Sequence, residues 1–394
     1  MPVPVPVRVP VPVPVPLLHA NVVHIPKLIR NAAIHTHHRC CIRQTSSYQF
    51  TPPSTTRAGR WLRLLVPGER PSTTPTTHFA WARTVRTGGE VLACNLTIMV
   101  DTPFGRVITA MVTPMYADGS IDYDGLQNLA VYLADHGHDG LLVNGTTGES
   151  ATTTDEEDYA CVRAVVEAVG DRVQVMAGCG TNDTEHSTRA AREMVACGAD
   201  SLLVVTPYYN KPPQDCILEH FRLVAEAGGG VPVMLYDIPG RTGTALSTDT
   251  IRHAADIPAV RAVKDAKGDF FEASRLMSQT DLLWYSGDDV VNLPHLAQGA
   301  TGIVSVVGHV AGDLYAEMIA AVDRGDLPRA REIHRRLIPA VDAIMHVSQG
   351  AIQAKAAMKM LGVISSDALR MPYRQGPPEH QQRLRVGLGE SGLL

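Results

Sequence analysis

Lys264 ends a short apolar run, Val260–Lys264, and its position suits covalent chemistry. A lysine that closes a buried strand loses hydration, and desolvation lowers the pKa of its ammonium group. The neutral amine attacks a ketone to give a Schiff base. Taken alone, however, a lysine is more often a solvated loop residue. The catalytic interpretation therefore needs a second group beside it.

Tyr236 supplies that group, because it lies near the end of the preceding apolar run, Pro232–Ile238. Schiff-base formation moves protons in several steps, and a phenol can carry them if other hydroxyls relay them onward. Thr146 and Tyr209 are candidates for the relay. Without Lys264 on the next run, Tyr236 would be interpreted as a buried tyrosine with a satisfied hydroxyl.

A Gly-Thr-Thr-Gly-Glu-Ser turn, residues 145–150, follows another apolar run. Its glycines allow close backbone approach, and its N–H groups and the hydroxyls of Thr146 and Thr147 suit a small carboxylate. The alternative is an ordinary tight turn between a strand and a helix. Gly178-Cys179-Gly180 falls short of a dinucleotide fingerprint, so no NAD site is expected.

The candidate site residues lie at the ends of apolar runs that recur at regular intervals along the sequence. After about residue 100, short apolar runs alternate with amphipathic helical stretches, a pattern typical of βα units around a parallel sheet. Eight units in series predict a closed (β/α)8 TIM barrel, whose active site lies at the carboxyl ends of the strands. The expected strands are Val107–Thr113, Gly140–Asn144, Val173–Gly178, Ser201–Thr206, Pro232–Ile238, Val260–Lys264, Leu282–Ser286 and Gly302–Val306.

Helical spacing fills the intervals between the strands and continues beyond the last one. Thr154, followed by three acidic residues, predicts a helix start there. We expect a barrel over residues 101–310 and a C-terminal helical extension over residues 311–394 that offers oligomer contacts. The expected helices are Tyr123–His136, Asp155–Val169, Thr184–Cys197, Pro213–Ala227, Asp313–Arg324, Leu327–His346 and Gly350–Leu361.

Residues 1–100 predict a disordered, low-complexity leader, because alternating Pro and Val are followed by a Ser, Thr, Pro and Arg-rich stretch. A transit peptide and a start codon placed too far upstream both fit. We favour the second, because Pro-Val repeats do not form an amphipathic presequence helix. Chance composition is favoured over a metal site for the leader's cluster of His35, His37, His38, Cys40 and Cys41.

Composition narrows the function classes. The chain has 394 residues, of which 45% are hydrophobic and 19% charged, and no apolar stretch is long enough to span a membrane. From residue 95 onward, 24 Lys and Arg face 38 Asp and Glu, which disfavours nucleic acid as a partner. The seven cysteines lack zinc-ligand or disulfide-scaffold spacing. We expect reduced thiols, a cytoplasmic location, no membrane association and no metal.

From about Phe104 to Pro372 the sequence resembles the dihydrodipicolinate synthase family, within the N-acetylneuraminate lyase superfamily. The motifs that carry the resemblance occur in family order. They are Thr-Ala-Met-Val-Thr-Pro (109–114), Gly-Thr-Thr-Gly-Glu-Ser (145–150), Thr-Pro-Tyr-Tyr-Asn-Lys-Pro (206–212), Tyr-Asp-Ile-Pro-Gly-Arg-Thr-Gly (236–243), Val-Lys-Asp (263–265), Ser-Gly-Asp-Asp (286–289) and Gly-Ile-Val-Ser-Val (302–306).

The resemblance implies a lyase of class I aldolase type that joins pyruvate to L-aspartate 4-semialdehyde in lysine and diaminopimelate biosynthesis. It implies a Schiff base at Lys264, with Tyr236 as acid and base, and no separate cofactor. Thr146 would link Tyr236 to Tyr209, and that last tyrosine would enter a neighbouring subunit's site in a homodimer, commonly paired into a tetramer. The implied substrate-binding residues are Thr147, the backbone of Val304, Arg241 and Gly287.

Arg241 decides between members of the superfamily. A guanidinium can bind the semialdehyde carboxylate through two hydrogen bonds, whereas the sialic-acid lyases carry an apolar residue there. The main alternative is a related Schiff-base aldolase acting on a 2-keto-3-deoxy sugar acid. A catalytically silent barrel with a binding role is the other, although Lys264, Tyr236, Thr146 and Tyr209 are all present.

One departure concerns regulation. Members of the family that lysine inhibits use two histidines after the Glu-Ser turn and a glutamate after a Gly-x-Gly-x-Asn segment. This chain has Asp155, Asp158 and His186 at those three places, while Ser150, Ala151, Asn182 and Tyr208 match. The resemblance therefore implies weak or absent inhibition by lysine.

Overall fold

The computed structural model describes residues 86–87, 90–91 and 102–394. Of the expected leader, residues 1–100, the structure describes only two short strands, and the His/Cys cluster lies outside the described residues. Those strands, β1 (Arg86–Thr87) and β2 (Glu90–Val91), pair in antiparallel fashion.

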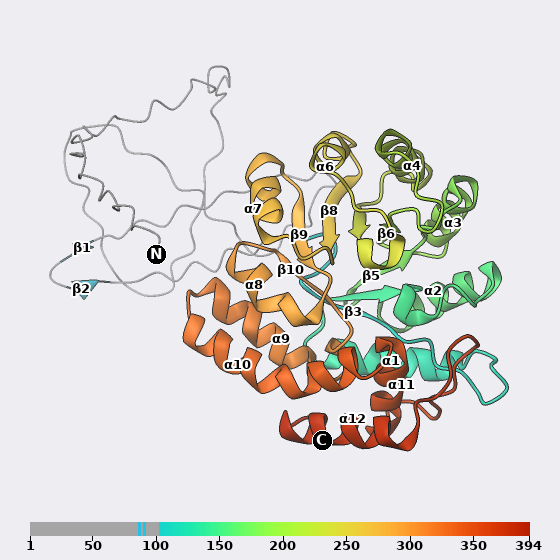
Figure 1. The fold of residues 1–394 in the computed structure, drawn as a ribbon, viewed down its shortest axis with the longest axis vertical. Helices are drawn as coiled ribbons and strands as arrows, with labels where there is room; N and C mark the ends of the chain where they lie inside the picture. Colours follow the sequence, from blue (N-terminus) through green and yellow to red (C-terminus); the bar gives the residue numbers. More distant parts are fainter. Residues whose placement is uncertain (1–85, 88–89, 92–101) are drawn as a thin grey trace, which may run out of the picture. The chain divides into compact units, whose positions relative to one another are not determined.

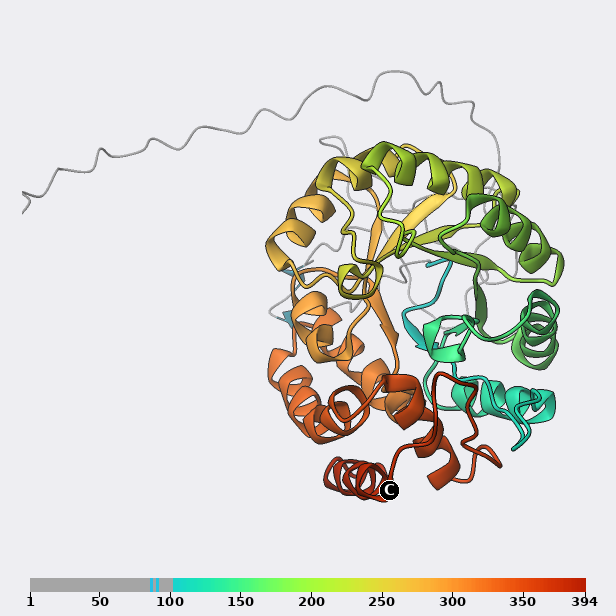
Figure 2. The same cartoon turned by 45° about the vertical axis from the view of Figure 1, so that its right-hand side comes forward.

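Eight parallel strands form a closed barrel, as the alternating pattern predicted, in the order β10-β3-β4-β5-β6-β7-β8-β9. A ring of helices surrounds them (Figures 1 and 2). Each strand begins within one residue of its predicted start, and some end earlier. The strands are β3 (Val107–Ala110), β4 (Gly140–Val143), β5 (Gln174–Gly178), β6 (Ser201–Val205), β7 (Val233–Asp237), β8 (Val260–Asp265), β9 (Leu283–Ser286) and β10 (Gly302–Ser305).

Seven α-helices lie between successive strands and cover the outside of the barrel. Helix α2 begins with the capping box expected at Thr154, whose side chain accepts from Glu157 N while the Glu157 side chain accepts from Thr154 N. The helices are α1 (Tyr123–Asp135), α2 (Asp155–Val169), α3 (Thr184–Ala196), α4 (Gln214–Ala227), α6 (Thr248–Ala254), α7 (Phe270–Gln279) and α8 (Asn292–Ala297).

Helix α9 (Gly308–Asp323) follows the last strand and spans the boundary expected at residue 310. The chain continues through α10 (Leu327–Val341), the short π-helix η3 (Asp342–His346) and α11 (Gly350–Met360). A final helix, α12 (Pro378–Glu390), was not expected from the sequence. Its buried face consists of Leu384, Gly387 and Leu388, too few apolar residues to give a clear helical period.

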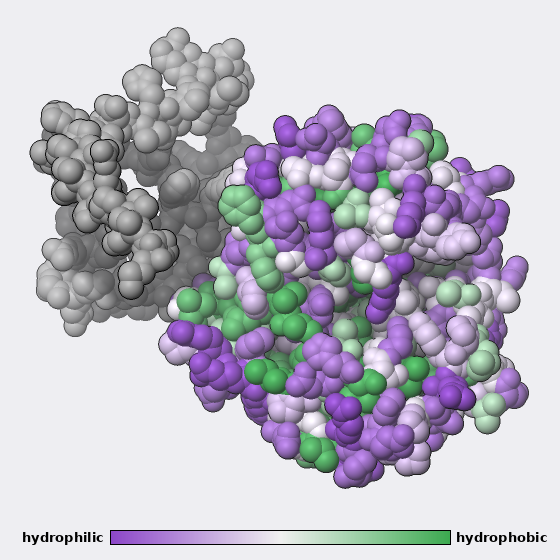
Figure 3. Space-filling model, viewed as in Figure 1, coloured by the Kyte–Doolittle hydropathy of each residue, from purple (hydrophilic) through white to green (hydrophobic). Residues whose placement is uncertain are grey.

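Alternation along the strands sorts side chains into two layers, because successive residues of a strand point to opposite faces. On β7, Val233 and Leu235 pack among the helices, whereas Met234 and Tyr236 fill the barrel interior. A third apolar cluster lies beneath α9, α10 and α12. Hydrophilic residues predominate on the face seen in Figure 3, with hydrophobic residues scattered among them.

Candidate active site

A cavity of about 810 Å³ opens at the carboxyl ends of the barrel strands. Its wall includes residues that follow β4, β6, β7 and β9, and Lys264 of β8. Among the expected site residues, the lining contains Thr146, Thr147, Tyr209, Tyr236, Arg241, Lys264 and Gly287. The structure thus brings together side chains that are up to 141 positions apart in the sequence, from residue 146 to residue 287.

Lys264 reaches this cavity from inside the barrel. Val263, its neighbour on β8, packs among the helices, so alternation along the strand turns Lys264 inward. The side chain is buried, and desolvation together with the positive charge of Arg241 lowers its pKa to about 7. A substantial share of the amine is therefore neutral at physiological pH, as nucleophilic attack on a ketone requires.

Tyr236 is the register partner of Lys264 in the β7–β8 ladder. The Lys264 Nζ lies 4.1 Å from the centroid of the Tyr236 ring. Burial raises the pKa of the phenol to about 12, so Tyr236 remains protonated at a pH where the Lys264 amine is largely neutral. A phenol that can donate a proton thus lies beside an amine that can act as a nucleophile, and each group has the required protonation state at the same pH.

Gly287 explains how Lys264 fits. A Cβ atom at this position would lie 2.9 Å from Lys264 Cγ and 3.1 Å from the Asp265 carbonyl oxygen. The missing side chain therefore leaves the space that the lysine stem occupies. Val304, by contrast, is not among the residues that line the cavity, and its side chain packs in the barrel interior with Tyr236.

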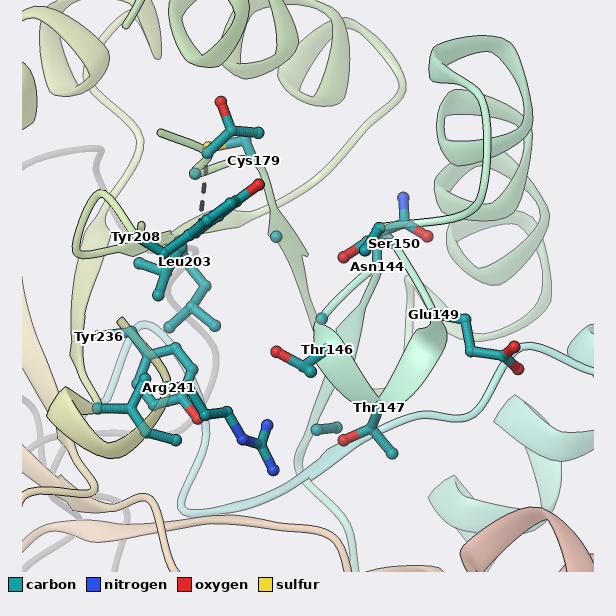
Figure 4. Close-up of a pocket in the computed structure, with 18 of the residues that line it drawn as sticks. Asn144, Thr146, Thr147, Glu149, Ser150, Cys179, Leu203, Tyr208, Tyr236 and Arg241 are labelled. Atoms are coloured by element: carbon teal, nitrogen blue, oxygen red, sulfur yellow. Dashed lines mark hydrogen bonds between the residues drawn. The ribbon is translucent and has the colours of Figure 1, made fainter. Parts of the chain in front are cut away.

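Arg241 lies on the single-turn helix α5 (Pro239–Thr242), which follows β7 and was not expected from the sequence. Pro239 begins the turn, and Gly243, with φ of 74°, ends it. Figure 4 shows the guanidinium projecting into the cavity near Tyr236 and toward Thr146 and Thr147. A cation placed there can bind a carboxylate without disturbing the strands that hold the nucleophile.

The turn after β4 forms a 3₁₀ helix, η1 (Thr146–Gly148). Within residues 102–394, the backbone N–H groups of Thr146 and Thr147 find no hydrogen-bond partner. The first donors of a helix lack internal acceptors, which makes them available to an anion. The Gly148 carbonyl on the other side accepts from Thr113 Oγ1 at 2.7 Å, which fixes the turn to the chain after β3.

Tyr209 is 87% exposed and has a positive φ of 74°, a conformation unusual for a tyrosine. Among residues 102–394, no hydrogen bond joins the hydroxyls of Thr146, Tyr209 and Tyr236. Thr146, Tyr209 and Tyr236 therefore line one cavity of a single chain, but their hydroxyls do not form a continuous hydrogen-bonded chain in it.

Asp289 was not selected from the sequence, although its position just after β9 could have suggested it. Its buried carboxylate accepts hydrogen bonds from the backbone N–H groups of Val306 and Val307 and from Tyr315 Oη, at 2.8, 2.9 and 3.0 Å. It thereby fixes the chain after β10. Its charge also partly opposes the lowering of the Lys264 pKa.

A side lobe of the cavity is acidic. Asp155 Oδ1 lies 2.8 Å from His186 Nε2, and Thr153 Oγ1 donates to Asp158 Oδ1 at 2.6 Å. Burial raises the Asp158 pKa to about 7. Two carboxyl groups therefore stand where lysine-inhibited members of the family were expected to carry histidines.

Three further findings concern the residues that the structure describes. No helix among them combines the length and apolar character needed to cross a bilayer. Within the same residues, no cluster of three or more His, Cys, Asp or Glu side chains is arranged to hold a metal ion. The four cysteines in this part of the chain, Cys161, Cys179, Cys197 and Cys216, are free thiols.

Comparison with known proteins agrees with this geometry. Residues 103–390 match the model of the dihydrodipicolinate synthetase family. The 4-hydroxy-tetrahydrodipicolinate synthase of Kineococcus radiotolerans is 56% identical over 291 residues, which are 74% of this chain and 94% of the relative.

Solved structures give the same result. Dihydrodipicolinate synthase from Cyanidioschyzon merolae, solved with lysine bound, has 41% identity and a TM-score of 0.72, covering 74% of this chain and 99% of that one. The enzyme from Acinetobacter baumannii, complexed with pyruvate, has 31% identity and a TM-score of 0.71, covering 74% of this chain and 100% of that one. This chain belongs to the dihydrodipicolinate synthetase family.

Proposed function

We propose that this chain is a 4-hydroxy-tetrahydrodipicolinate synthase that condenses pyruvate with L-aspartate 4-semialdehyde through a Schiff base at Lys264. The observation that carries the proposal is a buried amine with a pKa of about 7, positioned 4.1 Å from the ring of a tyrosine at the base of an open cavity. The names of the closely similar relatives support the same reaction.

The first half-reaction forms the imine. The Lys264 amine adds to the keto carbon of pyruvate, and Tyr236 supplies the proton with which the former keto oxygen leaves as water. Thr147 and the N–H groups of the η1 turn bind the pyruvate carboxylate. Removal of a methyl proton then gives an enamine, whose carbon is the nucleophile for the second substrate.

The second half-reaction joins the two substrates. The enamine carbon attacks the aldehyde carbon of L-aspartate 4-semialdehyde, and the new alkoxide takes a proton from the hydroxyl relay of Tyr236, Thr146 and Tyr209. The amino group of the product then replaces Lys264 at the imine carbon, which closes the ring and restores the free lysine. No metal ion or separate cofactor takes part.

Tyr209 and assembly belong to the same proposal. A tyrosine that is 87% exposed and held at positive φ suits a side chain that completes the site of a second subunit. The active unit is then a homodimer, which can pair into a tetramer. The proposed compartment is the cytoplasm, where the free thiols of the described residues remain reduced.

Replacement of Arg241 by alanine tests the choice of second substrate. We expect kcat/KM for the semialdehyde to fall by about 10 to 100-fold, because a charge-assisted contact contributes roughly 1.5–3 kcal/mol. Pyruvate should still form a trappable imine. Steady-state kinetics and borohydride trapping measure the two effects, and Arg252→Ala, which removes an exposed Arg252–Asp249 pair, is the control. If neither imine formation nor semialdehyde turnover changed, the assignment would fail, and a sugar-acid aldolase would become the better candidate.

Lysine at millimolar concentration is expected to inhibit turnover weakly or not at all. Asp155 repels the carboxylate of lysine, and its pairing with His186 leaves that imidazole less free to bind the amino group. Asp158, with its pKa raised to about 7, adds to the repulsion through its ionised fraction. A turnover assay at half-saturating pyruvate, with and without lysine, measures this. Strong inhibition would show that the acidic lobe accepts lysine after all.

A further inference from the structure

Glu149 belongs to the Gly-Thr-Thr-Gly-Glu-Ser turn and is among the residues that line the cavity, but its carboxylate does not point toward the other site residues. Figure 4 shows its carboxylate directed away from Thr146, Tyr236 and Arg241. The residue has a positive φ of 62° and is buried. The Glu149 carboxylate is therefore buried away from the substrates and takes no part in the proposed reaction.

The partner of Glu149 comes from the C-terminal helices. Lys355 of α11 donates from Nζ to Glu149 Oε1 at 2.5 Å, and also to the Ala368 carbonyl oxygen at 2.7 Å. The Arg370 backbone N–H donates to Glu149 Oε2 at 3.0 Å. The Lys355 and Glu149 side chains are 0% and 1% exposed, so this ion pair has no access to water.

The side chain of Arg370 ties the same C-terminal segment to the chain that follows the turn. Its guanidinium makes two 2.6 Å hydrogen bonds to the Glu157 carboxylate and donates to the Thr152 carbonyl oxygen at 2.9 Å. Thr152 N in turn donates to the Glu149 carbonyl oxygen at 2.9 Å. Hydrogen bonds from α11 and from the segment that follows it therefore fix the position of the turn on the side of the Glu149 carboxylate.

We propose that the Glu149–Lys355 ion pair is a positioning device for the turn that binds the keto acid's carboxylate. This inference rests on the proposed function. Thr146 and Thr147 of the η1 turn line the cavity, and the Glu149 carboxylate that follows them points the other way, into the buried ion pair. Removing one partner leaves an uncompensated buried charge, and the turn must shift to let that charge reach water. The C-terminal helices thereby set the affinity for the first substrate.

The test compares two lysines of the same helix. Lys355→Met removes the buried cation, whereas the control, Lys359→Met, removes a half-exposed lysine that pairs with Asp367 at 2.7 Å and does not contact the turn. For Lys355→Met we expect the KM for pyruvate to rise about tenfold or more while kcat changes less than about threefold, because the turn is displaced but the nucleophile is not. The pyruvate concentration that half-saturates borohydride trapping should rise in parallel.

A second variant guards against misfolding. Glu149→Gln combined with Lys355→Met removes both charges, a change that buried ion pairs often tolerate. We expect this protein to unfold at a higher temperature than Lys355→Met, because no unpaired buried charge remains. It should still show a raised half-saturation for pyruvate, because the turn has lost its ion-pair tie to α11.

The possible outcomes separate the two proposals. The positioning role is overturned if folded Lys355→Met and the double variant both match Lys359→Met in pyruvate half-saturation, even if their unfolding temperatures fall. It is supported if half-saturation rises in both, or in the double variant alone when Lys355→Met does not fold. If the unaltered chain traps no pyruvate, the proposed function itself fails and this inference with it.

Discussion

Lys264→Ala is expected to lose covalent capture of pyruvate entirely and to lose turnover by about 10³-fold or more, because the nucleophile itself is removed. Mass spectrometry after borohydride reduction measures the first effect. In the unaltered chain, the mass added by reduced pyruvate should map to the peptide that contains Lys264. The added mass should be absent in the variant, which should otherwise remain folded.

The matched control is Lys267→Met, three positions along the chain. The Lys267 ammonium pairs with Glu272 and donates to the Leu246 carbonyl oxygen, so its removal should leave trapping intact. With the Lys264 pKa at about 7, the trapping rate at low pyruvate should rise from about pH 6 to about pH 8 and then level off, because only the neutral amine attacks. An adduct that persists in Lys264→Ala, or that maps elsewhere, would contradict the mechanism.

Tyr236→Phe is expected to lower kcat by about 10² to 10⁴-fold, the usual contribution of a positioned acid and base. The substitution keeps the ring that packs 4.1 Å from Lys264 Nζ and removes only the hydroxyl. Imine formation should become slow, yet reach the same extent when given time. Single-turnover trapping and steady-state turnover measure the two quantities.

Tyr285→Phe is the control for this effect. Tyr285 also points into the barrel, but its hydroxyl donates to the Gly105 carbonyl oxygen at 2.8 Å, near the amino-terminal ends of the strands. Its loss should cost about 1 kcal/mol of stability, the net worth of a typical hydrogen bond, and leave kcat close to that of the unaltered chain. Equal kinetic losses in the two variants would mean that Tyr236 acts through the fold and not through proton transfer.

Much of the architecture could be predicted because it follows from local patterns. Short apolar runs identify the strands, their ends place Tyr236 and Lys264 at the carboxyl end of the barrel, and consecutive βα units make β7 and β8 neighbours. The helix start at Thr154 follows from its capping box. These features depend on residues within a few positions of each other.

Other features depend on contacts between distant residues. Glu149 and Lys355 are 206 positions apart, and the sequence does not indicate that a positive φ turns Glu149 away from the cavity. Helix α12 lacks a strong apolar period, because it buries only a narrow face against the preceding helices.

Lys264 and Arg241 lie on separate elements, β8 and α5, and this separation affects how such proteins can change substrate. The Lys264 amine, which we propose captures pyruvate, is anchored in a strand ladder, whereas Arg241 lies on a four-residue helical turn that begins with Pro239 and is capped by Gly243. If the proposed roles hold, exchanging that turn should change the preferred aldehyde while Lys264 and Tyr236 stay in place. Engineers seeking new carbon–carbon bond-forming biocatalysts from this scaffold should therefore randomise residues 239–243 first.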